Sequence, residues 1–186
     1  MTSAGSVEGD ARLRLFLALQ LPSTTLDALE TWMRERLRGG GRAVPREHLH
    51  VTLAFLGSRP ETDLDAVVET LRAASSVAGP ITLAPVRWRE TRSVGMIALE
   101  DLTGEATALA TRLHARLSEL GLYTPEARPW LPHVTVLRFR SRPRLDPPLP
   151  AMGTFVPSGA AAYLSHLHPS GARYEVLDSV SLTAGG

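Results

Sequence analysis

Two short segments of the chain carry the same pattern of histidine and threonine. Residues 50–53 read His-Val-Thr-Leu and residues 133–136 read His-Val-Thr-Val, each inside an apolar stretch typical of a β-strand. Residues two apart on a strand point to the same face, so each histidine shares a face with its own threonine. Two imidazoles that meet across a phosphate, one neutral and one protonated, form an acid/base pair near neutral pH.

The threonine hydroxyls of these segments can donate hydrogen bonds to phosphate oxygens, and an arginine can balance the charge of the transition state. A single His-x-Thr in a strand is common by chance and is more often a packed or solvated residue than a catalyst. Two copies in comparable strands favour the catalytic interpretation. The pattern therefore predicts a phosphate-ester site that needs no metal.

Three residue types are missing from the 186-residue chain, which contains no Cys, no Lys and no Asn. Without Cys there is no thiol nucleophile, disulfide or thiolate metal site. Without Lys there is no Schiff base, no P-loop lysine and no lysine adenylylation of the kind used by ATP-dependent ligases. All 20 Lys-or-Arg positions are arginine, and the chain is rich in alanine; the base composition of the genome also explains this bias. An anionic substrate must therefore be held by arginine.

The formal net charge of +1 does not indicate a protein that coats long nucleic acid by charge alone. A small or single-stranded phosphate ligand remains open. No cleavable signal and no membrane span is visible, so we expect a cytoplasmic monomer.

Hydrophobic periodicity and turn residues predict an alternating series of strands and helices. We expect a loose tail over residues 1–11 and a single domain over 12–186. The expected strands cover 12–19, 48–56, 81–89, 94–100, 131–139, 161–167 and 174–182, and the expected helices 23–38, 62–74 and 104–120. Ser23 is expected to cap the first helix, and residues 141–150 to form a proline-rich surface loop.

Four segments carry a resemblance to a known family: residues 15–19, 49–57, 128–138 and 171–177, which together span nearly the whole chain from Arg12 onward. The two His-x-Thr motifs in this order, with Pro132 before the second histidine and Arg138 after it, resemble the signature motifs of the 2H phosphoesterase superfamily. The wider context is similar to its bacterial RNA 2′,3′-cyclic phosphodiesterases, historically called 2′-5′ RNA ligases.

The resemblance implies an α+β, bilobal fold with pseudo-twofold symmetry, in which two small antiparallel sheets line a central cleft and helices lie outside. It implies hydrolysis of 2′,3′-cyclic phosphate ends of RNA or nucleotides to 2′-phosphomonoesters, with no metal and no cofactor. His50 would be the general acid and His133 the general base, with Thr52 and Thr135 on the phosphate oxygens. A reverse 2′-5′ ligation, another cyclic phosphate or a 2′-5′ oligonucleotide as substrate, and an RNA-binding module without turnover remain alternatives.

Four further residues are candidate substrate contacts. The family places an arginine near the phosphate at the position of Arg138, but five residues after His133 a flat strand would point it to the opposite face, so a bulge or twist is required. Phe16, Trp130 and Tyr174 are candidate contacts to the base or to other parts of the substrate.

The remaining histidines and arginines have ordinary explanations as well as functional ones. His48 with His50, and His166 with His168, invite a metal hypothesis, but without Cys or an obvious third ligand we expect no metal site. We expect His114 to lie on a solvated helix face. Two arginine clusters could guide an RNA end toward the cleft or could be plain charged surface: Arg34, Arg36, Arg38, Arg42 and Arg46, and Arg138, Arg140, Arg142 and Arg144.

Overall fold

One antiparallel sheet runs through the whole molecule. The computed structural model describes residues 11–169 and 171–182, and its strands follow the order β4-β5-β6-β3-β1-β7-β8, with β2 paired to β6. The strands are β1 (Arg12–Gln20), β2 (Arg42–Ala43), β3 (His50–Pro60), β4 (Leu83–Glu90), β5 (Val94–Asp101), β6 (His133–Arg138), β7 (Gly159–His166) and β8 (Arg173–Val180).

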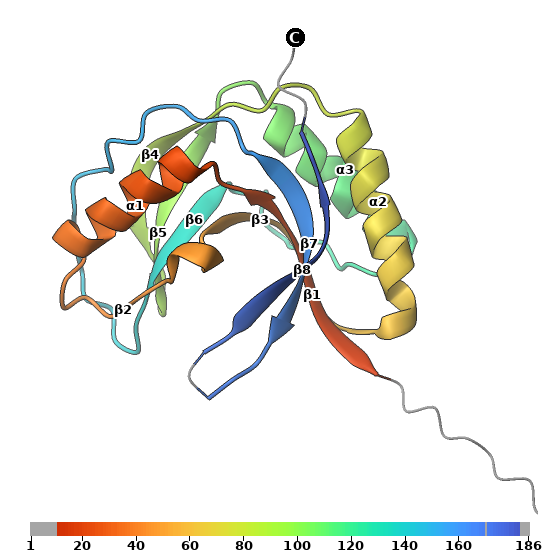
Figure 1. Cartoon of the computed structure of the whole chain (residues 1–186), viewed down its shortest axis with the longest axis horizontal. Coiled ribbons are helices and arrows are strands. Elements are labelled where there is room, and N and C mark those ends of the chain that lie inside the picture. Colours follow the sequence, from red (N-terminus) through yellow and green to blue (C-terminus); the bar gives the residue numbers. More distant parts are fainter. Residues whose placement is uncertain (1–10, 170, 183–186) are drawn as a thin grey trace, which may run out of the picture.

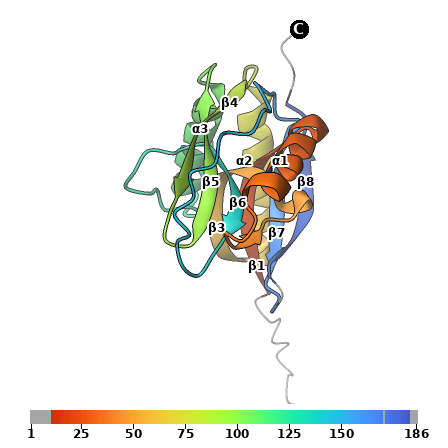
Figure 2. The same ribbon diagram turned by 90° about the vertical axis from the view of Figure 1, so that its left-hand side faces the viewer.

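Three α-helices cover this sheet: α1 (Ser23–Arg36), α2 (Leu64–Ser76) and α3 (Glu105–Glu119). Figures 1 and 2 show α1 on one side of the strands and α2 with α3 on the other. The helices α2 and α3 pack on each other and on β3, β5, β7 and β8, while Trp32 of α1 lies 6.1 Å from Trp88 of β4. Apolar side chains between helices and sheet form the core, including the fully buried Leu29, Leu71 and Leu113.

Two stretches of the chain, β1-α1-β2-β3 and β5-α3-β6, each lead from a strand through a helix to a strand that begins with a motif histidine. The two units meet at the centre of the sheet, where β3 pairs with β6 through a single residue pair, Val51 with Val134. The expected α+β class with antiparallel strands is confirmed. The expectation of two separate sheets is wrong, because this one pair joins both halves into a continuous sheet.

The expected elements lie close to the observed ones, with a few local differences. Ser23 does not cap the first helix: the capping position is Pro22, and no side chain caps that end. The strand β2, only two residues long, has no counterpart among the expected elements because so short a segment carries no periodicity. The expected tail lies, except for Ala11, outside the described residues. No helix in the described ranges is long and apolar enough to cross a membrane.

Candidate active site

A cavity of about 340 Å³ opens over the junction of β3 and β6. Its walls come from both halves of the sheet, from the segment that follows β2 and from the hairpin formed by β7 and β8. The lining residues are Arg14, Phe16, Arg42, Ala43, Val44, Pro45, His48, His50, Thr52, Phe55, His133, Thr135, Arg138, Ser165, Leu167, Ala172 and Tyr174. Both histidines and both threonines of the repeated motif thus lie on one cavity.

Each motif histidine is oriented by the backbone two residues before it. The Nδ1–H of His50 donates to the carbonyl of His48 at 2.7 Å, and the Nδ1–H of His133 donates to the carbonyl of Leu131 at 2.8 Å. The two bonds have the same form because both rings stand at the first residue of their strand. They leave Nε2 of each ring as the nitrogen available for proton transfer in the cavity.

The threonines extend this arrangement across the junction. Oγ1 of Thr52 lies 3.0 Å from Nε2 of His50, so the hydroxyl donates to the neutral ring and accepts from the protonated one. Val51 and Val134, the residues between histidine and threonine in the two motifs, form the one pair that joins β3 to β6, so both motifs meet at this junction. On each strand the histidine and the threonine two residues later therefore share the face that lines the cavity.

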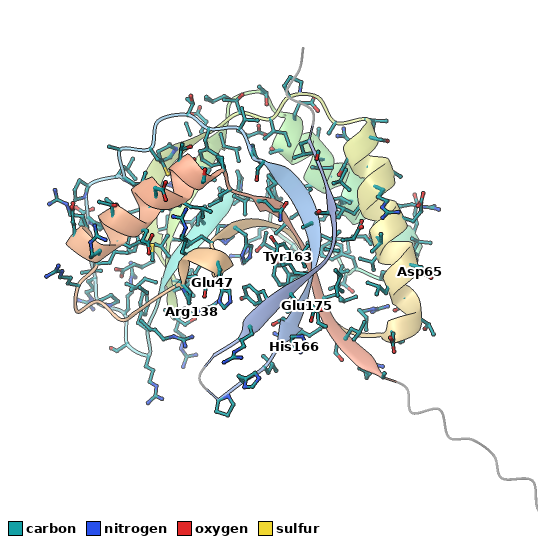
Figure 3. All side chains as sticks on the ribbon, in the orientation of Figure 1. Glu47, Asp65, Arg138, Tyr163, His166 and Glu175 are labelled. Atoms are coloured by element: carbon teal, nitrogen blue, oxygen red, sulfur yellow. The ribbon has the colours of Figure 1, made fainter. Side chains whose placement is uncertain are left out.

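His50 lies in a more apolar setting than its position at a cavity wall suggests. The ring of Phe16 is 5.0 Å from it, and Tyr163 and Tyr174 are 6.2 and 5.7 Å away. Figure 3 shows Tyr163 on β7 of the β7–β8 hairpin and Arg138 toward the α1 side of the molecule.

This setting lowers the pKa of His50 to about 4. Burial is the largest cause, and the nearby positive charges of His133 and Arg138 add to it, while the bond to the His48 carbonyl acts in the opposite direction. In the ligand-free protein His50 is therefore neutral at pH 7.

Arg138 reaches the cavity through a β-bulge. In the pairing of β6 with β5, Thr135 lies opposite Met96 and Leu137 lies opposite the neighbouring Gly95. Val136 between them has no partner in β5 and is an extra residue. An extra residue reverses the alternation of side chains beyond it. Arg138, five residues after His133, thereby comes to the same cavity as that histidine.

The first motif has a bulge at the same distance from its histidine, and this bulge brings Phe55, which was not among the expected site residues, to the cavity. In the pairing of β3 with β1, Leu53 is the extra residue, and it lies three residues after His50. In the pairing of β6 with β5, the extra residue Val136 likewise lies three residues after His133. Phe55, five residues after His50, lines the cavity and is 49% exposed, with the Arg14 guanidinium 4.8 Å from its ring. Phe55 follows His50 by five residues, as Arg138 follows His133, and this equal spacing was the signal in the sequence that could have indicated Phe55.

The three aromatic candidates have different placements. Phe16 lines the cavity but is only 3% exposed, so it forms the floor beneath His50. Tyr174 lines the cavity from the hairpin, 4.5 Å from the ring of His48. Trp130 lies outside the lining, and its indole N–H donates to the carbonyl of Thr52 at 3.0 Å. Trp130 thus binds the backbone of β3 outside the cavity and stabilises the position of that strand.

His114 and His166, which lie outside the cavity lining, are held by protein groups. The expectation that His114 is a solvated residue is wrong: its ring stacks on Tyr123 and its Nε2–H donates to the Leu53 carbonyl at 2.7 Å. That carbonyl belongs to the bulged residue of β3, which explains why it needs a partner from α3. His166 faces Glu175 at 3.0 Å across the β7–β8 hairpin (Figure 3). Within the described ranges, no group of three or more His, Asp or Glu side chains could hold a metal ion.

Comparison with known proteins places the chain in a family. A family model described as the 2′-5′ RNA ligase superfamily matches residues 22–168. The chain belongs to the 2′-5′ RNA ligase superfamily. The match includes α1, α2, α3 and both His-x-Thr strands, whereas Phe16 and Tyr174 lie outside it.

Two RNA 2′,3′-cyclic phosphodiesterases resemble the chain over nearly its whole length. The RNA 2′,3′-cyclic phosphodiesterase of Thermus thermophilus is 30% identical, covering 91% of this chain and 90% of that protein. The RNA 2′,3′-cyclic phosphodiesterase of Escherichia coli is 28% identical, covering 91% and 97%.

Solved structures show the same fold. A Thermus thermophilus protein superposes with a TM-score of 0.78 at 29% identity, covering 91% of this chain and 98% of that one. Escherichia coli LigT complexed with 3′-AMP gives a TM-score of 0.77 at 24% identity, covering 93% and 99%.

Proposed function

We propose that this protein hydrolyses the 2′,3′-cyclic phosphate ends of RNA or nucleotides to 2′-phosphomonoesters, without a metal ion. The observation that carries the proposal is the pair of Nδ1–H bonds to backbone carbonyls, which leaves two Nε2 atoms for one cavity. The names of the curated superfamily relatives support the same reaction class.

His133 acts as the general base and His50 as the general acid. Nε2 of His133 takes a proton from a water molecule, and the water oxygen bonds to phosphorus. The bond between phosphorus and the 3′ oxygen breaks, and Nε2–H of His50 gives its proton to that departing oxygen. The phosphate stays on the 2′ oxygen, and the two histidines exchange protons with solvent to start again.

Thr52, Thr135 and Arg138 bind the phosphate oxygens while negative charge develops on them. The hydroxyls supply hydrogen-bond donors and the guanidinium supplies a fixed positive charge, both already in place before the reaction. Phe55, half exposed at the cavity, offers a face on which the base can stack. Joining of ends would need a 5′-hydroxyl in the position of the attacking water, with His133 taking its proton.

Hydrolysis of a nucleoside 2′,3′-cyclic phosphate in the presence of EDTA tests this proposal, with the product identified by phosphorus NMR. We expect the 2′-phosphomonoester only, and loss of at least about a thousandfold in kcat for His50→Gln and for His133→Gln. His166→Gln is the matched control, since His166 lies outside the cavity lining and should keep normal turnover.

Two kinds of result would contradict the proposal. A 3′-phosphomonoester would show that the other phosphorus–oxygen bond breaks. Undiminished turnover in either motif variant would remove that histidine from the mechanism, and complete inhibition by EDTA would show that a metal ion takes part.

A further inference from the structure

A second groove adjoins the cavity and shares Arg42 and Arg138 with it. Its volume is about 860 Å³. Its walls are the segment between α1 and β2, the end of β6 with the loop that follows, and the tip of the β7–β8 hairpin. Gly40, Gly41, Arg140 and Arg142 also line it.

The charge of this groove has one sign. Four of its lining side chains are arginines, one is a histidine, and none is an aspartate or glutamate. Arg138 and Arg140 are exposed, and among the described residues neither has an ion pair or hydrogen bond from its guanidinium. A groove with unbalanced guanidinium groups attracts anions, and the planar fork of arginine fits phosphate oxygens in particular.

The loop that bears two of these arginines is fixed from beneath by Glu90. The side chain of Glu90 is 2% exposed, and its carboxylate accepts from Arg142 Nε at 2.9 Å, from the Leu145 amide at 2.7 Å and from the Arg144 amide at 3.1 Å. Trp32 of α1 adds a bond from its indole N–H to the carbonyl of Pro148 at 2.7 Å. The proline-rich loop is thus a fixed wall of the groove.

The opposite wall depends on a close approach of backbone to backbone. Gly41 has a φ of +147°, and a side-chain carbon there would lie 2.5 Å from the carbonyl oxygen of Arg138. At Gly40 such a carbon would lie 2.7 Å from Cδ1 of Leu145, so that side chain would have to shift. The glycines therefore bring this segment against β6 and narrow the groove beside the cavity.

We infer that this arginine groove binds the phosphates of the RNA strand that leads to the cyclic end, so that oligonucleotides are the preferred substrates. The inference rests on the proposed function, which places a cyclic phosphate at the two histidines. A strand whose last phosphate lies there has its preceding phosphate one nucleotide away. The groove continues from the cavity through Arg42 and Arg138, and it offers Arg140 to that preceding phosphate.

The test compares a nucleoside 2′,3′-cyclic phosphate with a trinucleotide that ends in the same group. For the wild-type protein we expect a higher kcat/KM on the trinucleotide and a steeper fall of its logarithm with the logarithm of salt concentration, by about 0.7 for each further phosphate bound. Arg140→Glu should lower the ratio of the two kcat/KM values roughly tenfold, mainly through KM. Arg116→Glu on α3 makes the same change of charge away from both cavities and should leave the ratio unchanged.

An unchanged ratio in Arg140→Glu, or equal salt dependence for both substrates, would overturn the inference while the proposed function stands. If the wild-type protein hydrolyses neither substrate, the proposed function fails, and binding decides the groove separately. A 5′-labelled trinucleotide with a 2′-phosphate should then bind Arg140→Glu about tenfold more weakly than Arg116→Glu, measured by fluorescence anisotropy. Equal affinities would show that the groove does not bind the strand.

Discussion

Binding of a phosphate group in the cavity should determine whether His50 is protonated near neutral pH. A general acid must carry its proton near neutral pH, yet burial, His133 and Arg138 lower the pKa of His50 to about 4 in the ligand-free protein. The perturbation to apply is therefore occupation of the cavity by an anion. We expect a 2′-nucleotide, the product of the proposed reaction, to raise the pKa of His50 strongly.

The size of this effect follows from the geometry. Thr52, a proposed phosphate ligand, lies 3.0 Å from Nε2 of His50, so a bound phosphate comes within about 4 Å of the ring. At that distance one negative charge stabilises an imidazolium by about 4 kcal/mol with an effective dielectric constant near 20. That free energy corresponds to a factor of about 1000 in proton affinity, which brings the acid form into the neutral range.

Histidine ring signals followed by NMR between about pH 3.5 and 8.5 provide the assay, with His50→Gln to assign the curve. The ring signals of His166, which faces Glu175 on the hairpin and lies outside the cavity lining, are the internal control and should keep their positions when the nucleotide is added. The reasoning is refuted if His50 titrates in the usual imidazole range without a ligand, or if saturating nucleotide moves its curve by less than about tenfold in proton concentration.

Three further outcomes are expected. Phe55→Ala should raise KM for cyclic nucleotides about tenfold, through lost stacking, with little change in melting temperature because the ring is 49% exposed; an unchanged KM would remove Phe55 from the site. Glu90→Gln should lower the free energy of unfolding in urea by about 2 kcal/mol, since three donors lose a buried carboxylate, and a loss below about 0.5 kcal/mol would show that the loop is held otherwise. The folded protein binds a proton at His50 less readily than the unfolded chain does, so protonation of His50 favours unfolding. The free energy of unfolding should therefore fall by roughly 3 kcal/mol as pH drops from 6.5 to about 4, with no such loss above pH 6.5. His50→Gln should flatten that part of the stability profile, and an unchanged profile would contradict the lowered pKa of His50.

The placement of each histidine with its own threonine could be predicted from the sequence because it depends on strand alternation alone. A residue and its second neighbour share a face of any strand, so His50 with Thr52 and His133 with Thr135 needed no knowledge of pairing. Their meeting in one cavity was expected from the repeat and from the family resemblance.

Features that depend on how strands pair could not be predicted in the same way. The bulge that directs Arg138 to the cavity is a property of the register between β5 and β6, and the sequence indicated only that some bulge was needed. Phe55 was missed because its bulge lies in the register with β1. Likewise the continuous sheet depends on one pair, Val51 with Val134, which no local pattern specifies.

Trp130 and His114 show a second limit. Both carry groups that could act on a substrate, but both donate to backbone carbonyls of β3, at Thr52 and Leu53. The partners are 78 and 61 residues away along the chain, so only the folded structure reveals these bonds.

The position of β1 between β3 and β7 has a consequence for how the protein is made. Leu15, near the start of the chain, pairs with Leu164 near its end, and the cavity takes residues from Arg14 to Tyr174. During synthesis, β1 emerges from the ribosome well before β7, so it gains its second neighbouring strand only after the residues between them have followed. Pairings so distant in sequence are typical of domains that fold in milliseconds to seconds. The wall of the cavity that β7 and β8 supply is therefore absent until these two strands have paired with β1.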